Sequence, residues 1–298
     1  MTVGSRLAKS LSRRGSSTEN WLEQVMAPRR SKEKKEDEIT ERTAPTGEVV
    51  YHAVYREGEH ELERGTAELA LSGLAAGLSM GFSLQSESLL QAHLSDAPWR
   101  PLLTKLGYSV GFVIVILGRQ QLFTKNTLTV ILPLLRKLQR EILGKVARLW
   151  IVVLATNLMG AFLFAWLLGK TNVFDENVRA IFSRIATEAI QPNFGLLLLR
   201  GILAGWLIAL MVWLLPFAES ARFWVVILLA YIIGLAGLPH VIAGNVETFY
   251  LVTVGGISLG HCVIDYLLPA LLGNIIGGVA LVALGAHAEF IEADRMLK

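Results

Sequence analysis

Long apolar runs, separated by short polar stretches, fill the chain from residue 69 to residue 288. The runs lie at roughly 69–90, 106–135, 149–169, 196–216, 223–254 and 266–288. Each run is long enough to cross about 30 Å of hydrocarbon as a helix that rises about 1.5 Å per residue. None shows the alternating segments of about ten residues that form an outer-membrane barrel. The pattern therefore predicts an all-α integral membrane fold with six transmembrane helices.

The second and fifth runs are the longest, and polar residues and glycines interrupt both. The second contains Gly118-Arg119-Gln120-Gln121, and the fifth contains Gly237-Leu238-Pro239-His240, followed by Gly244-Asn245. Non-helical backbone at membrane depth is tolerated only where protein buries it or where it lines a water-filled cavity, because each unpaired N–H or C=O costs several kcal/mol. Helices 2 and 5 are therefore predicted to be broken beside a cavity, with Pro239, Gly244 and Asn245 supporting the second break.

Short matches relate the two halves of the apolar region. Asn157-Leu-Met-Gly160 recurs as Asn274-Ile-Ile-Gly277, at an offset of 117 residues that also carries Phe123 onto His240. The first and fourth runs share two glycines spaced four residues apart. Because each half holds three helices, the second half must enter the membrane upside down, as in the inverted repeats of many transporters. We therefore expect two inverted three-helix repeats, in which Asn157 and Asn274 tie the broken backbone to neighbouring helices.

Composition separates two regions that face different solvents. The chain is 53% hydrophobic and 18% charged, with a mean hydropathy of +0.48, which is too apolar for a soluble enzyme of this length. Residues 1–64 nevertheless hold 24 of the 53 charged side chains. We predict a charged, partly disordered cytoplasmic region over 1–65, a six-helix channel domain over 66–290 and a cytoplasmic tail over 291–298.

The charge of the N-terminal region changes sign along its length. Residues 1–35 carry nine Lys or Arg against three Glu, whereas residues 36–64 carry nine acids against three bases. Val49, Val50 and Val54 mark amphipathic helical turns in the second part. This part is interpreted either as an interaction arm with a helix at the membrane surface or as a solvated tail that improves solubility.

The most basic short connection follows the second run. It contains one acid, Glu141, against five bases: Arg136, Lys137, Arg140, Lys145 and Arg148. Because cytoplasmic loops carry an excess of Lys and Arg, this connection is predicted to be cytoplasmic. Six crossings then place both termini in the cytoplasm.

Several function classes are disfavoured. The net charge of +3 lies beside apolar spans, where membrane topology explains it better than nucleic-acid binding does. The single cysteine, Cys262, excludes an intramolecular disulfide and a metal site with several cysteines. The sequence shows no Ser/His/Asp constellation, metal-ligand cluster or glycine-rich phosphate loop, so we expect neither an enzyme nor a cofactor.

Three motifs occur in a distinctive order. Leu122-Phe123-Thr124 lies at the first break, His240 at the second, and Gly273-Asn274-Ile-Ile-Gly277-Gly278 opens the last run. With this order the chain resembles the formate/nitrite transporter family over about residues 66–288. The resemblance implies an aquaporin-like fold, a homopentamer with one pore per protomer in the inner (plasma) membrane, and passage of small monovalent anions or their conjugate weak acids.

The polar lining departs from the family pattern although the scaffold persists. The changed positions are Arg119, Gln120, Gln121, Lys125, Gly205, Pro239 and Gly244. These changes keep two alternatives open. One is an aquaporin-like pore for an uncharged small solute, and the other is a non-transporting membrane scaffold that recruits a partner through its N-terminal region.

His240 and Thr124 are the candidates for the centre of the pore. Dehydrating a bare anion in an apolar constriction costs on the order of tens of kcal/mol, whereas the neutral acid costs far less. Histidine titrates near physiological pH, so His240 is predicted to donate or stabilise a proton at this barrier. Thr124 is predicted to hydrogen-bond the substrate or the histidine. The structural alternatives are a buried, satisfied histidine and a threonine that caps the half-helix.

Four apolar residues are predicted to form constrictions beside this centre. Leu122 and Phe123 lie at the first break, and Ile233 lies two helical turns before His240. Phe112, about three turns before Phe123, is predicted to add to the outer gate. The alternative for all of them is ordinary packing.

Charged residues inside the apolar runs are unusual. Arg119 and Lys125 flank the first break and are predicted either to draw anions into the cytoplasmic vestibule or to pair with Glu247 at the other break. Arg200, near the start of the fourth run, is expected to extend toward the lipid headgroups.

Overall fold

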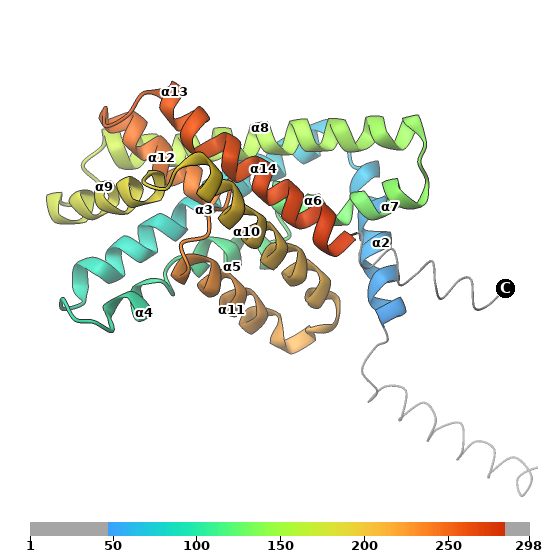
Figure 1. The fold of residues 1–298 in the computed structure, drawn as a ribbon, viewed down its shortest axis with the longest axis horizontal. Helices are drawn as coiled ribbons and strands as arrows, with labels where there is room; N and C mark the ends of the chain where they lie inside the picture. The colour runs from blue at the N-terminus through green and yellow to red at the C-terminus, as the bar shows by residue number, and fades with distance from the viewer. Residues whose placement is uncertain (1–46, 284–298) are drawn as a thin grey trace, which may run out of the picture. The chain divides into compact units, whose positions relative to one another are not determined.

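A computed structural model describes residues 47–283, and these residues form helices and connecting turns without any β-strand (Figure 1). The predictions for residues 1–46 and for the tail at 291–298 lie outside the described residues. Among residues 47–283, five helical segments are long and apolar enough to cross a membrane. The prediction of an all-α membrane fold is therefore confirmed.

Two pairs of long helices form the framework. Helix α3 (Thr66–His93) packs along α8 (Arg140–Lys170), and α10 (Phe194–Leu214) packs along α14 (Leu268–Ile276). Helix α14 belongs to a continuous helical segment with α13 (Leu259–His261), η3 (Cys262–Leu267) and η4 (Gly277–Ala283). The short turns η1 (Leu215–Phe217) and η2 (Glu219–Ala221) follow α10.

The second and fifth apolar runs each contain helices separated by non-helical backbone. In the second run, α4 (Arg100–Thr104) and α5 (Ser109–Leu117) precede residues 118–122, which lead into α6 (Phe123–Thr129) and α7 (Ile131–Arg136). In the fifth, α11 (Arg222–Leu235) precedes residues 236–242, which lead into α12 (Ala243–Val254).

Two amphipathic helices lie at opposite ends of the described bundle (Figure 1). Helix α2 (Gly47–Glu63) packs on α6, α7, α8 and α10, with Tyr51, Val54 and Leu62 buried. Helix α9 (Glu176–Ile190), capped by the Asp175 carboxylate, packs on α3 and α12. We call these the α2 end and the α9 end. The pattern of apolar runs did not predict α9, because its buried residues recur every three to four positions within a polar segment.

Glycines allow the paired helices to touch backbone to backbone. A Cβ atom on Gly77 of α3 would collide with the backbone of Asn157 in α8, and one on Gly205 of α10 would collide with the backbone of Asn274 in α14. Small residues at helix interfaces permit this approach in membranes. The close contact brings each asparagine side chain to the neighbouring helix.

We expect two glycine-to-alanine substitutions to change the stability of the folded protein in opposite directions. Gly77→Ala forces the α3 and α8 backbones apart and lowers stability by about 1–3 kcal/mol. Gly144→Ala, at an exposed site of α8 with no atom near the new Cβ, raises helix propensity and stability by about 0.5–1 kcal/mol. Thermal unfolding in detergent measures both. Equal melting temperatures for the two variants would contradict the close contact.

Candidate transport pathway

A buried asparagine holds the non-helical backbone before α6. The Asn157 side chain accepts a hydrogen bond from Phe123 N–H at 2.9 Å and donates to the carbonyls of Gln121 at 2.8 Å and Gly73 at 2.7 Å. The hydroxyl of Ser72 accepts from Gln121 N–H. These bonds satisfy backbone groups that would otherwise be unpaired where the helix begins.

A second asparagine repeats the arrangement before α12. The Asn274 side chain accepts from Val241 N–H at 2.9 Å and donates to the carbonyls of Pro239 at 2.9 Å and Gly201 at 3.0 Å. Each asparagine therefore joins two positions of the non-helical segment to a glycine of the paired helix. The two sets of bonds align Phe123 with Val241, so Leu122, not Phe123, corresponds to His240.

His240 lies in the non-helical segment before α12, and its ring is fully buried. Its Nδ1 atom faces the N–H groups of Ile242 and Ala243 at 3.3 and 3.2 Å, so Nδ1 is the acceptor. The hydrogen-bond network therefore places the proton of the neutral ring on Nε2. Nε2 lies 2.7 Å from Thr124 Oγ1, which is also fully buried. The structure thus brings together the two residues predicted for the centre of the pore.

Apolar side chains surround this pair. The Phe112 ring meets the His240 ring edge to face, with centroids 4.9 Å apart, while Phe123 packs in the same way on Trp150. Phe112, Leu122, Phe123 and Ile233 are each at most 1% exposed. The region around the pair is therefore closed to water in this structure.

Two chambers lie on either side of this closed region. The α9-end chamber, of about 150 Å³, has Ile233, Pro239, Gly244 and Glu247 in its wall. The α2-end chamber, of about 640 Å³, has walls from α2 and from the residues before α6. No residue in the described part of the chain lines both chambers. Ile233 is the one predicted constriction residue that lines a chamber, because neither wall includes Phe112, Leu122 or Phe123.

The residues predicted to support the second break occupy distinct positions. The Asn245 side chain, in the first turn of α12, donates to the carbonyl of Val241 just before that helix, at 2.5 Å. Gly244 lies beneath the hydroxyl of Tyr266, which fills the space that a Cβ atom would need. Pro239 supplies a carbonyl to Asn274 and lines the α9-end chamber.

Acidic side chains of α2 neutralise the predicted vestibule lysine. Lys125 Nζ lies 2.7 Å from a Glu57 oxygen and 3.4 Å from a Glu61 oxygen. The Glu61 carboxylate also accepts from Gln121 Nε2 at 2.6 Å and from Arg64 at 3.1 Å. These contacts anchor α2 over the residues that precede α6.

The predicted pairing of Lys125 or Arg119 with Glu247 is wrong. Glu247 lines the α9-end chamber, whereas Arg119 and Lys125 line the chamber at the opposite end. Glu247 belongs to α12, which packs on α9, so it lies at the α9 end and out of reach of both cations. Arg119 has a positive φ of 50° and is exposed where the chain turns after α5.

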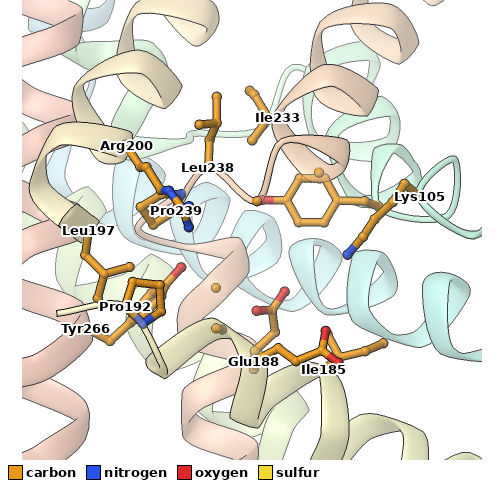
Figure 2. A pocket seen from close by; sticks show the side chains of 16 residues that line it. Lys105, Ile185, Glu188, Pro192, Leu197, Arg200, Ile233, Leu238, Pro239 and Tyr266 are labelled. Carbon is orange, nitrogen blue, oxygen red and sulfur yellow. The ribbon is translucent and has the colours of Figure 1, made fainter. Parts of the chain in front are cut away.

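Sequence reasoning missed most of the polar wall of the α9-end chamber. Figure 2 shows Lys105 and Arg200 extending toward this chamber from opposite sides. Arg200 therefore lines a chamber, where the sequence predicted contact with headgroups. The hydroxyl-bearing rings of Tyr108 and Tyr266 complete the wall. A charged residue inside an apolar run was the available signal for Arg200, and no local pattern identified the two tyrosines.

Within residues 47–283, no group of three or more His, Cys, Asp or Glu side chains is placed to hold a metal ion. The His240 ring instead makes hydrogen bonds to two backbone N–H groups and to Thr124.

Comparisons with known proteins agree on one family. The sequence model of the formate/nitrite transporter family matches residues 48–288. The chain is 40% identical over 256 residues to the inner membrane protein YfdC of Escherichia coli, covering 86% of this chain and 83% of that protein. It is 27% identical over 227 residues to the uncharacterised transporter YwcJ of Bacillus subtilis, covering 71% of this chain and 85% of that protein.

A solved structure shares the fold. A pentameric formate channel with formate bound superimposes with a TM-score of 0.65 at 21% sequence identity, covering 76% of this chain and 98% of that chain. The all-helical fold of this chain is therefore a known one.

We expect Asn157→Ala and Asn274→Ala each to lower stability by on the order of 3 kcal/mol, because each removes three hydrogen bonds and leaves buried backbone groups unpaired. Asn172→Ala, which removes one exposed bond to Arg179, is the control and should change stability little. Thermal unfolding in detergent compares the three variants. A loss for the control as large as for Asn157→Ala would contradict this role.

Proposed function

The chain belongs to the formate/nitrite transporter family, and from this premise we propose that it conducts small monovalent anions or their conjugate weak acids between the two chambers. It is a transport protein by family and not an enzyme. The observation that carries the proposal is the buried His240–Thr124 pair, which lies between chambers at opposite ends of the bundle. The solute class comes from the family and from the neighbouring formate channel.

In this proposal six helical units cross the membrane as two inverted repeats of three. Helices α5 and α6 are the halves of the second unit, and α11 and α12 are the halves of the fifth. The Asn157 side chain accepts from Phe123 N–H in the first half, and the Asn274 side chain accepts from Val241 N–H in the second. This match between the halves supports the repeat. Inverted repeats of this kind place the solute site at their interface, near the midplane.

The chemistry of passage follows from the cost of charge in an apolar region. Phe112, Leu122 and Ile233 surround a zone in which an ion would lose its hydration at a cost of on the order of tens of kcal/mol. Nε2–H of neutral His240 donates to Thr124 Oγ1, which leaves the threonine hydroxyl proton free to bond the solute. A solute that takes up a proton before this zone crosses it as the neutral acid, so flux is proton-linked.

We further propose a homopentamer in the inner membrane with the α2 end in the cytoplasm. The neighbouring channel is pentameric, and the related YfdC is an inner membrane protein. The basic residues around α7 and the start of α8 lie at the α2 end, which supports its cytoplasmic orientation.

A second candidate is an aquaporin-like pore for an uncharged solute. One observation favours it: the carboxylates of Glu57 and Glu61 neutralise Lys125, so this lysine adds no net attraction for anions at the α2 end. Uptake that ignores a pH gradient would support this candidate over the anion pathway.

The test measures formate, nitrite and acetate uptake by the purified protein in liposomes, with and without an inward proton gradient. We expect the gradient to accelerate uptake, and His240→Ala to reduce it by about tenfold or more, because each ~1.4 kcal/mol added to the barrier is a factor of ten. His93→Ala, which alters an exposed histidine at the end of α3, should leave uptake unchanged. Undiminished flux through His240→Ala would remove the histidine from the mechanism.

A further inference from the structure

The α9-end chamber has the size of a small-molecule site. Its volume is about 150 Å³, and an apolar cavity of about this size holds one benzene molecule. A ligand of about six non-hydrogen atoms therefore fits. Unlike such an apolar cavity, this chamber is lined by two acids, two bases and two tyrosines.

Glu247 is the most unusual residue of its wall. It is 8% exposed, and among residues 47–283 it makes neither a hydrogen bond nor an ion pair. Lys105, a cation of the same wall, is bonded to Glu87 instead. An ionised carboxylate in such a place is unstable by several kcal/mol unless a cation or hydrogen-bond donor meets it. The chamber therefore offers Glu247 to a ligand that carries such a group.

Arg200 contributes the opposite charge to the wall of the same chamber. Its guanidinium also has no hydrogen-bond or ion-pair partner among residues 47–283. Figure 2 shows Arg200 on the side opposite Lys105, with Glu188 on a third side. With Lys105 matched to Glu87, the charges left for a ligand are the cation of Arg200 and the carboxylates of Glu188 and Glu247.

A simple anion fits this charge pattern poorly. It would bond to Arg200, but the carboxylate of Glu247 would remain unpaired and would repel it. An amine without a carboxylate would bond to Glu247 and leave Arg200 unmatched. A small zwitterion satisfies both ends, and the hydroxyls of Tyr108 and Tyr266 add hydrogen bonds between them.

We infer that the α9-end chamber binds a small amino acid of the size of glycine or β-alanine, with its ammonium group at Glu247 and its carboxylate at Arg200. The bound zwitterion occupies the space that a weak acid crosses on its way to His240, so it competes with that acid. This competition rests on the proposed transport function, whereas the binding itself does not.

Calorimetric titration of the purified full-length protein in nanodiscs tests the binding. The probes are glycine, β-alanine, acetate and methylammonium. We expect either amino acid to bind more tightly than both single-charge probes by about tenfold or more, because each single-charge probe leaves one charge of the chamber unpaired. Equal affinity for acetate and glycine, or heat from none of the four probes, would overturn the inference.

Two variants locate the site. Glu247→Gln keeps the shape of the side chain and removes its charge, so it should weaken glycine binding by about tenfold or more while leaving acetate binding unweakened. Glu176→Gln removes an exposed charge at the start of α9 and should change nothing. The size-exclusion profile of each variant reports whether it folds. Unchanged glycine binding in folded Glu247→Gln would overturn the assignment.

Formate uptake in liposomes separates this inference from the proposed function. If His240-dependent uptake is present and glycine neither binds nor slows it, the inference fails and the transport function stands. If glycine binds through Glu247 and no solute crosses, the transport function fails and the binding site stands.

Discussion

Non-helical backbone inside a membrane must find hydrogen bonds within the protein, and two asparagines meet this requirement here. Asn157 and Asn274 each bind a helix-starting N–H group, a carbonyl before it and a glycine carbonyl on the paired helix. Water does not reach these backbone groups in an apolar environment. The hydrogen bonds to each asparagine therefore stabilise the fold by more than burial of the side-chain amide costs. The glycines that let the helices touch also bring each asparagine side chain within reach of these backbone groups.

The position of the site follows from these bonds. Fixing the backbone before α6 places Thr124 in the first turn of that helix, and fixing the backbone before α12 places His240 just ahead of its own helix. The two side chains meet at 2.7 Å although 116 residues separate them. The chambers on either side are unlike. At one end α2 carboxylates neutralise Lys125, whereas at the other Arg200 and Glu247 have no partner among residues 47–283. A nearly symmetric scaffold thus carries an asymmetric polar lining.

The local sequence pattern predicted those features of the fold that depend on which residue types are stable at membrane depth. The apolar runs, their interruptions and the recurring asparagines are visible in the sequence because membrane depth restricts which residues are stable there. The pairing of charges was not predictable in this way. Lys125 meets Glu57 and Glu61 across more than sixty residues of chain, and Glu247 turns to the end opposite Lys125. Helix α9 was not predicted because its apolar face is narrow. The contact of Tyr266 with Gly244 was not predicted because it forms only through tertiary packing.

We expect the two chambers to open on opposite faces of the membrane, separated by the closed region around His240 and Thr124. Substituted cysteines in a Cys262→Ser background distinguish the two faces when a membrane-impermeant thiol reagent is added. Glu188→Cys reports on the α9-end chamber and Arg119→Cys on the α2-end chamber. Glu188→Cys should react only in intact cells with an opened outer envelope, and Arg119→Cys only in inside-out vesicles. Reaction of both cysteines from the same face would contradict this arrangement.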